Sequence, residues 1–304
     1  MRPLLASPAA DLAPSPSVRA RLADLRVLLK PGIAGHVVFA AAAGYLLGVE
    51  GAVDWPTLVG LLLGTALASG GAGAINHAAE GRWDAQMERT QHRPVAANRV
   101  RAPFAFLYGI ALTAAGLVVL ALTTNALTTA LAAATVGAYV LVYTPLKRRT
   151  WLNTLVGSVP GALPALGGVT AATGAIGAIG SVVFGILFLW QLPHFYALAW
   201  TYRADYARGG FRMLPVVEPD GRATARHVLV ASLLLLVVGL LPTALGQAGW
   251  LYFVGMAALG TAFTLPAFSF HAEPTDERAR RLFLASVVYV PAFLALIVVD
   301  FLLR

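Results

Sequence analysis

The sequence contains no cysteine and few charged residues. The missing thiols exclude disulfides, thiolate metal sites, iron–sulfur clusters and cysteine nucleophiles. Only 12% of the 304 residues are charged, against roughly 25% in an ordinary soluble domain. A soluble globule of this length could not cover the remaining apolar surface, because 58% of the residues are apolar and the mean hydropathy is +0.74. A water-soluble fold is therefore ruled out.

Long apolar segments take the place of the missing charge. Each is long enough to cross a bilayer as a helix, which takes about 20 residues. Alternation at strand period is absent, which disfavours a β-barrel. The sequence thus predicts an all-α integral membrane protein with about nine transmembrane helices, whose backbone groups are satisfied within each helix. The expected spans are roughly 33–49, 57–79, 104–122, 124–143, 153–173, 175–198, 227–247, 249–268 and 281–303.

The basic residues lie on one side of this predicted bundle. With nine spans, every Lys and Arg except Arg304 falls in the N-terminal segment or in the connections after spans two, four, six and eight. The positive-inside rule then predicts a cytoplasmic N-terminus and a C-terminus outside. The cations that orient the helices account for the net charge of +8, so a nucleic-acid partner is not expected.

The chain divides into a cytoplasmic arm, residues 1–30, and a nine-helix domain, residues 31–304. Within the arm we expect Ser17 to cap a short amphipathic helix that lies on the inner membrane surface. The apolar face of this helix would carry Val18, Leu22, Leu25 and Leu29. The outer connections are short and the inner ones are long and polar, so an active surface is expected on the cytoplasmic side.

The first of three polar segments lies at the end of the second span. Asn76, Glu80, Asp84 and Glu88 follow one another at intervals of four, which places them on one stripe of a helix. Like charges at this spacing repel, so the stripe makes sense if a cation lies on it, and such oxygen ligands suit Mg²⁺ beside a substrate phosphate. Polar residues at the membrane boundary are candidates for function. The pattern also fits a solvated helix end.

The second polar segment follows span four and carries three consecutive cations. Lys147, Arg148 and Arg149 could hold an anionic group. The same triplet also fits a stop-transfer cluster that only orients spans four and five. The neutral donors beside it are Thr144, Thr150 and Asn153.

The third polar segment begins near the cytoplasmic end of span six. Gln191 and His194 lie there, where a histidine is either a ligand or a helix-packing residue. Tyr202 and Asp205 follow in the connection. Asp205, among arginines, is either ion-paired in a loop or a second metal-binding carboxylate that faces the first set across the bundle.

Acidic and basic patches therefore surround one mouth of an apolar bundle. A lipophilic diphosphate fits this layout, with its tail among the helices and its head held by Mg²⁺, Arg and Lys. Metal and cationic clamps stabilise the charge that develops on a departing diphosphate.

These segments resemble the UbiA superfamily of intramembrane prenyltransferases, and more closely its protohaem IX farnesyltransferase branch. The run Asn76-x3-Glu80-x3-Asp84 is similar to the NxxxDxxxD motif of the superfamily. The resemblance covers about residues 27–300 and includes the count of nine helices. Four further runs match the branch: Met87-x-Arg89-Thr90-x-x-Arg93-Pro94, Tyr143-Thr144-x-Leu146-Lys147-Arg148-x-Thr150-x-x-Asn153, Trp190-Gln191-x-Pro193-His194-Phe195 and Asp205-Tyr206-x-x-Gly209-x-x-Met213-Leu214-Pro215.

Several positions depart from the pattern of the branch. Glu80 replaces the usual aspartate, and Gly81-Arg82 stands where Arg-Asp is usual. Ala204 stands where a second acid usually precedes Asp205. These changes reduce the negative charge that is available to a metal ion.

The resemblance implies a condensation of haem B with farnesyl diphosphate to haem O, in which haem is a substrate. Mg²⁺–diphosphate would be held by Asn76, Glu80, Asp84 and Asp205. Arg89, Arg93, Lys147 and Arg148 would clamp the diphosphate, and Thr144, Asn153, Gln191 and Tyr202 would complete the substrate site. His194 would contact the haem iron or a propionate, with His36 and His77 as weaker candidates.

The resemblance also implies a setting for the reaction. It places the chain in a prokaryotic plasma membrane with the active site facing the cytoplasm, and names haem A synthase as a partner. Two alternatives stay open from the residues alone. One is a related prenyltransferase for a quinone precursor or chlorophyllide, and the other is a transporter or a non-catalytic membrane scaffold.

Overall fold

The structure is a computed structural model that describes residues 17–303, and all its regular elements in that range are helices. Nine helical segments within it are long and apolar enough to cross a membrane, as the sequence predicts. The elements are α1 (Val18–Leu28), α2 (Pro31–Gly48), α3 (Trp55–Asp84), α4 (Ala102–Thr123), α5 (Ala126–Gly137), η1 (Ala138–Tyr143), α6 (Thr144–Leu146), α7 (Asn153–Thr173), α8 (Gly177–Thr201), α9 (Arg203–Arg208), α10 (Leu214–Val217), α11 (Arg222–Ala244), α12 (Trp250–Ala272) and α13 (Asp276–Leu303).

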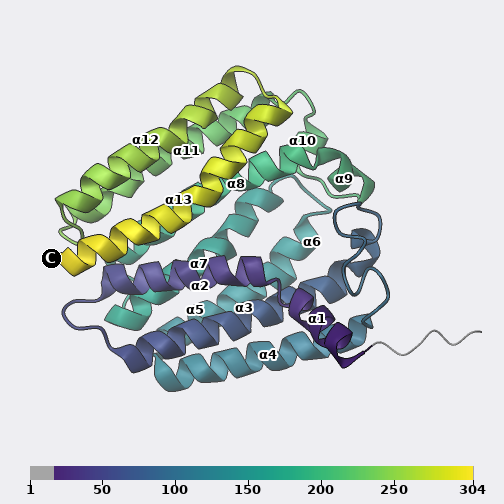
Figure 1. Ribbon diagram of the computed structural model, residues 1–304, viewed down its shortest axis with the longest axis horizontal. Helices are drawn as coiled ribbons and strands as arrows, with labels where there is room; N and C mark the ends of the chain where they lie inside the picture. Colours follow the sequence, from purple (N-terminus) through teal and green to yellow (C-terminus); the bar gives the residue numbers. More distant parts are fainter. Residues whose placement is uncertain (1–16, 304) are drawn as a thin grey trace, which may run out of the picture.

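The long helices form two neighbouring groups in one bundle (Figure 1). Helices α2, α3, α4, α5 and α7 make one group, and α8, α11, α12 and α13 make the other. The short elements α1, α6, α9 and α10 gather at one end, and the C-terminal end of α13 lies at the other. Because the helices alternate in direction, the basic connections share the end that carries α1. The predicted segregation of charge is thus confirmed for the described residues.

Small residues let the helices of the first group approach closely. At the crossing of α3 and α4, a Cβ added at Gly71 would lie 2.5 Å from the carbonyl oxygen of Gly109, and one added at Gly109 would lie 2.6 Å from that of Gly71. Neither position has room for a side chain. Backbone-to-backbone packing of this kind is the main source of attraction between helices in lipid, where the hydrophobic effect is absent.

Helix α3 extends further than its hydropathy predicts and ends at Asp84. The hydroxyl of Thr90 donates to the main-chain carbonyl of Asp84 at 2.9 Å as the chain turns away. The expected helical stripe is therefore correct for Asn76, Glu80 and Asp84 but wrong for Glu88, which lies beyond the helix with an exposed side chain.

The fourth span changes its winding near the polar end of the bundle. Its last turns form the π-helix η1, in which the backbone N–H of Thr144 reaches back to the carbonyl of Tyr139. Pro145 follows and has no N–H to continue an α-helical ladder, which explains the altered winding. The wider turn carries Tyr139 and Tyr143, and both side chains line the cavity described below.

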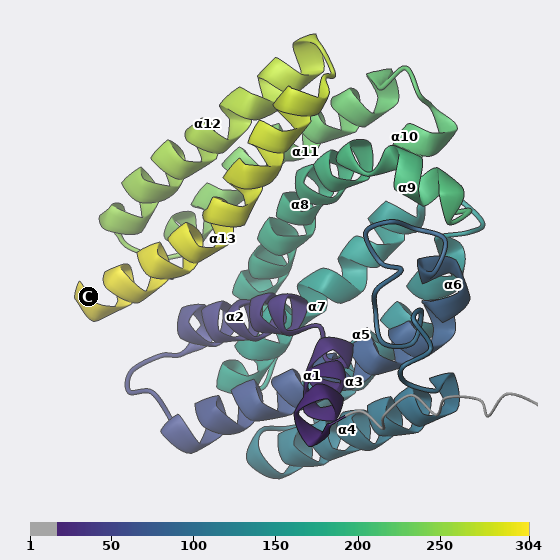
Figure 2. The same cartoon turned by 45° about the vertical axis from the view of Figure 1, so that its right-hand side comes forward.

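Helix α1 lies across the same end of the bundle (Figure 2). Its N-cap is Ser17, whose side chain accepts a hydrogen bond from the backbone N–H of Ala20 at 3.2 Å, as predicted. Val18 and Leu22 are exposed, whereas Leu28 is fully buried. The rest of the predicted arm, residues 1–16, lies outside the described residues.

Candidate active site

A cavity of about 520 Å³ lies between the two groups of helices, and most of its wall is apolar. Helices α2, α3, α7, α8 and α13 contribute to it, together with α5 and η1. Its charged lining residues come from the polar end of the bundle. They are Lys30, Glu80, Asp84, Arg89, Arg93 and Lys147.

The end of α3 brings three oxygen-bearing side chains together. Asn76, Glu80 and Asp84 lie on one face of the helix and are 0%, 3% and 1% exposed. The side-chain amide of Asn76 donates to the hydroxyl of Thr144 at 3.0 Å, which connects this face to the fourth span. The predicted grouping of these three residues is therefore present, and Thr144 supports it from a neighbouring helix.

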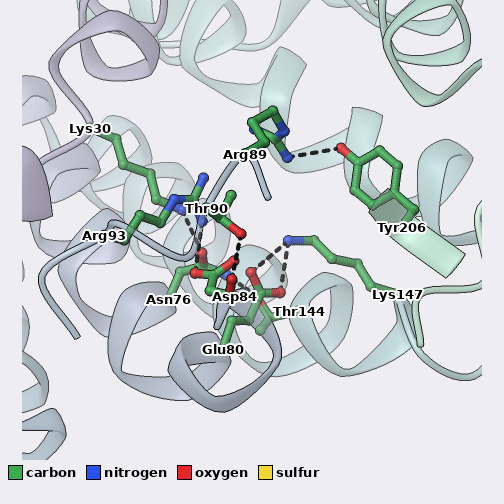
Figure 3. A network of polar contacts seen from close by, with 10 residues as sticks. All are labelled: Lys30, Asn76, Glu80, Asp84, Arg89, Thr90, Arg93, Thr144, Lys147 and Tyr206. Carbon is green, nitrogen blue, oxygen red and sulfur yellow. Dashed lines mark hydrogen bonds and ion pairs between the residues drawn. The ribbon is translucent and has the colours of Figure 1, made fainter. Parts of the chain in front are cut away.

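Each of these side chains has a cationic partner (Figure 3). Lys147 Nζ donates to both carboxylate oxygens of Glu80, at 2.8 and 3.1 Å. Arg93 pairs with Asp84 Oδ2 at 2.8 Å, and Lys30 Nζ donates to Asn76 Oδ1 at 2.5 Å. The cations thus neutralise carboxylates that would otherwise repel one another in a buried place.

The two lysines respond differently to these surroundings. Burial and the nearby Arg93 lower the pKa of Lys30 to about 7. Burial also disfavours a charged Lys147, but its ion pair with Glu80 outweighs that effect and raises the pKa of the ammonium above its usual range. Lys147 therefore keeps its charge at neutral pH.

Two polar atoms at this end of the cavity are left without a partner among the described residues. One is Asp84 Oδ1, an acceptor, and the other is Arg89 Nε, a donor. The guanidinium of Arg89 also lies over the rings of Tyr202 and Tyr206, at 5.1 and 5.7 Å, and bonds to the Tyr206 hydroxyl at 3.5 Å. Buried polar atoms normally find partners, so Asp84 Oδ1 is available to a cation and Arg89 Nε is available to an anionic oxygen.

Asp205 has its own partners, which differ from those of Glu80 and Asp84 on α3. Its carboxylate accepts the backbone N–H groups of Glu88 and Arg89, at 3.0 and 3.1 Å, and pairs with Arg208. Burial opposes its ionisation, but these N–H groups and Arg208 together lower the pKa of Asp205. The residue therefore holds the segment that carries Arg89, as the interpretation of an ion-paired carboxylate expects, and its role as a second metal-binding carboxylate stays a prediction.

Several candidates are not among the described lining residues of the cavity, namely Asn76, Thr144, Arg148, Asn153, Tyr202 and Asp205. Arg148 is exposed and its guanidinium lies 4.2 Å from the ring centre of Trp83. Asn153 is buried, and its amide donates to the backbone carbonyls of Thr150 and Arg212 at 2.6 and 3.0 Å. Arg148 thus contacts a ring of α3, and Asn153 holds two connections together.

The candidates from span six line the apolar part of the cavity. Gln191 is buried, and its amide donates to the carbonyl of Leu187 at 3.0 Å. His194 also lines the cavity, as does His36 on α2. His77 is buried and is not among the lining residues that the described part of the chain provides.

Sequence reasoning missed two residues of the cluster. The positive-inside rule alone accounts for a lysine at position 30. Its position directly before the first span is nevertheless a signal for a role at the polar end of the cavity. It adopts a left-handed backbone conformation with φ of 49°, which turns the chain from α1 into α2. Tyr206 is marked in the sequence only by its place in the motif that begins at Asp205. Conversely, the unusual Arg82 points outward over Trp83, so it adds no cation to the cavity.

The oxygen donors of this cluster fit a magnesium ion that is shared with a substrate. No group of three or more His, Cys, Asp or Glu side chains converges as a metal site within residues 17–303. Mg²⁺ does not need one, because it commonly keeps several waters and binds one or two carboxylates together with phosphate oxygens. Asp84 Oδ1 is the donor that is already free to bind it.

The sequence as a whole decides the family. Residues 37–297 match the model of the UbiA prenyltransferase family. The chain belongs to this family. It is 50% identical to a protein from Salinibacter ruber named protoheme IX farnesyltransferase, over 92% of this chain and 99% of that protein. A protein of the same name from Solibacter usitatus is 40% identical over 91% and 98% of the two chains.

Solved structures of this family share the fold. A structure of digeranylgeranylglyceryl phosphate synthase matches with a TM-score of 0.77 at 15% identity, over 93% of this chain and 99% of that one. A UbiA homologue from Archaeoglobus fulgidus, bound to GPP and Mg²⁺, matches with a TM-score of 0.68 at 17% identity, over 90% and 99%. The chain is thus a multi-pass membrane protein with the UbiA fold.

Proposed function

We propose that this protein transfers the farnesyl group of farnesyl diphosphate to haem B, giving haem O and diphosphate. The observation that carries the proposal is a charged cluster at one end of an apolar cavity. It occurs in a chain that is 50% identical to a protein named protoheme IX farnesyltransferase. The cluster suits the diphosphate, and the cavity suits the isoprenoid chain and the macrocycle.

The cations of the cluster hold the diphosphate. Arg89 offers the unpaired Nε donor, and its segment is fixed by Asp205. Arg93 and Lys147 line the same end of the cavity and bring positive charge to the leaving group. Lys30 adds a further ammonium beside Asn76.

Asn76, Glu80 and Asp84 are the residues that would hold Mg²⁺. The ion, when bound, supplies Lewis-acid stabilisation of the negative charge on the departing diphosphate. Phosphate oxygens could take the place of the carboxylates as partners of Lys147 and Arg93. Asp84 and Glu80 would then be available to the ion without a buried charge being left alone.

The first step of the reaction requires that water be kept from the farnesyl chain. The bond between C1 of the farnesyl chain and the diphosphate oxygen breaks, and the diphosphate leaves with the electron pair. A vinyl carbon of haem bonds to C1 of the allylic cation. Water adds to the other vinyl carbon and loses a proton to solvent, which completes the hydroxyethylfarnesyl group. The apolar wall limits premature capture of the allylic cation by water.

The setting of the reaction forms part of the proposal. By the positive-inside rule, the basic end of the bundle lies on the cytoplasmic side of a prokaryotic plasma membrane. The active site opens on that side, and haem A synthase takes up the product.

Mass spectrometry of haem tests the proposal directly. Purified protein in detergent, with Mg²⁺, haem B and farnesyl diphosphate, is expected to produce haem O and to release diphosphate. A parallel assay offers 4-hydroxybenzoate as the acceptor. Prenylation of that acceptor without any haem O would overturn the assignment of haem B as substrate.

A further inference from the structure

The imidazole of His194 contacts three aromatic rings and one hydroxyl group. Its ring lies between the rings of Trp190 and Phe283, with centroids 5.2 and 5.0 Å away and interplanar angles of 28° and 33°. Phe195 contacts it edge-on at 5.4 Å. The ring nevertheless lines the cavity. Its orientation is therefore fixed while one edge stays available to a ligand.

A chain of hydrogen bonds determines which nitrogen of this ring carries the proton. His194 Nδ1 lies 2.8 Å from Ser286 Oγ, and Ser286 Oγ lies 2.5 Å from the carbonyl oxygen of Phe283. The carbonyl can only accept, so the single hydroxyl proton of Ser286 is committed to it. Ser286 must then accept from His194, which places the imidazole proton on Nδ1 and leaves the lone pair on Nε2.

This tautomer is the one in which a histidine binds a metal through Nε2. Histidines that ligate metals donate their other ring N–H to an acceptor, which fixes the tautomer and raises the basicity of the ligating nitrogen. Ser286 also contributes its backbone carbonyl, which accepts the indole N–H of Trp190 at 2.8 Å. A single fully buried residue of α13 therefore positions both the imidazole and one of its flanking rings.

We infer that His194 Nε2 ligates the iron of the haem substrate, and that Ser286 is the positioning residue that fixes the tautomer of His194. The inference rests on the proposed function, because it takes haem as the acceptor. Holding the iron from one side fixes the macrocycle through its centre and leaves its vinyl edge free to meet the farnesyl chain.

His36 is the competing ligand, but it lacks the same support. Its Nδ1 donates to the carbonyl of Gly32 at 2.7 Å within its own helix, so its Nε2 is also unprotonated. Its side chain is exposed, and no ring contact of the described residues holds it. The contacts of His194 with Trp190, Phe283 and Ser286 therefore favour His194 over His36 as the ligand of the iron.

The test is a titration of the full-length protein in detergent with ferric haem B, followed by absorption and electron paramagnetic resonance spectra. The wild-type protein is expected to give the spectrum of histidine-ligated haem. His194→Ala should lose that spectrum and bind haem 10- to 100-fold more weakly, and added imidazole should restore it. An unchanged spectrum in His194→Ala, or its loss in His36→Ala alone, would overturn the assignment of the ligand.

Variants of Ser286 separate positioning from packing. Ser286→Ala removes the acceptor at nearly constant volume and should weaken haem binding about tenfold with an altered spectrum. Ser286→Thr keeps the hydroxyl and should retain both. A wild-type spectrum and affinity in Ser286→Ala would overturn the role of Ser286. His227→Ala is the matched control, because that ring likewise contacts two aromatic rings, Trp151 and Tyr196, but bonds the carbonyl of Ala223 and is not a lining residue of the cavity.

A second ligand distinguishes failure of this inference from failure of the proposed function. Binding of Mg²⁺ and farnesyl thiolodiphosphate, a poorly reactive analogue, should be unaffected in all these variants, because none alters the charged cluster. A wild-type protein that binds the analogue and prenylates another acceptor but never binds haem would overturn both proposals. Haem O production with an unaltered His194→Ala spectrum would overturn only the ligand.

Discussion

Asp84 and Asp205 lie in two polar segments at the same end of the bundle, yet their carboxylates have different partners. Asp84 ends α3 with one oxygen paired to Arg93 and the other without a partner among the described residues. Both oxygens of Asp205 accept backbone N–H groups of the segment that follows α3. A free oxygen can bind a metal, whereas a carboxylate engaged by the backbone supports a loop. Their hydrogen-bond partners distinguish the two roles, although their residue type does not.

The sharpest test of this difference is Asp84→Asn. The change keeps the size of the side chain but removes the charge and one oxygen ligand. Turnover should fall by about 10³-fold, comparable to the loss of a key electrostatic group in other active sites. Assays over a range of Mg²⁺ concentrations, with the melting temperature as a check on folding, provide the measurement. Activity within tenfold of wild type would show that Asp84 is not a required ligand.

Arg89→Gln tests the partner that Asp205 holds in place. Loss of the guanidinium removes the unpaired donor at the cavity, so turnover should fall by about 10²-fold. The affinity for the thiolodiphosphate analogue should fall with it. Arg82→Gln is the control, because that arginine points outward and should leave both quantities unchanged. Equal effects of the two changes would mean that only general surface charge matters.

Asp205→Asn should have a smaller effect of another kind. The amide can no longer accept through both oxygens, so one backbone N–H loses its partner at a cost of about 1–3 kcal/mol in stability. Turnover should fall about tenfold as the segment of Arg89 loosens. The dependence on Mg²⁺ should stay as in the wild-type protein. A loss of Mg²⁺ affinity like that of Asp84→Asn would restore Asp205 to the metal site.

Tyr206→Phe should have the smallest effect. It removes a hydroxyl that lies 3.5 Å from the guanidinium of Arg89, at the long limit for a hydrogen bond. The ring that the guanidinium contacts stays in place, so turnover should change by less than about threefold. A kinetic comparison with Arg89→Gln measures this directly. A loss of 10²-fold would show that the hydroxyl itself contacts the substrate.

Much of the fold could be predicted because apolar segments lie within the bilayer and basic connections lie on one side of it. Nine spans and the segregation of the basic residues follow from that. The end of α3 could not be predicted, because hydropathy falls at the membrane boundary while the helix continues to Asp84. The π-helical turn before Pro145 was also missed, since it depends on local backbone bonding.

Two kinds of signal pointed to the residues of the site, namely spacing along one helix and the motifs that carry Arg89, Arg93 and Lys147. Asn76, Glu80 and Asp84 share a face of α3 by periodicity alone. Asp205 and Arg148 come from other segments, and their positions depend on backbone N–H groups and on the ring of Trp83. Ser286 is 92 positions from His194 and belongs to no motif, so only the folded structure reveals its contact.

The ion pairs of Glu80 and Asp84 have a consequence for a protein that spends most of its time between substrates. Each carboxylate already has a resident counterion in Lys147 or Arg93. When a metal-bound anion arrives, these side chains therefore only change partners. The desolvation cost of placing the two carboxylates and their counterions in a low-dielectric region is part of the folding free energy. Each of the two carboxylates therefore keeps an opposite charge beside it before and after each turnover.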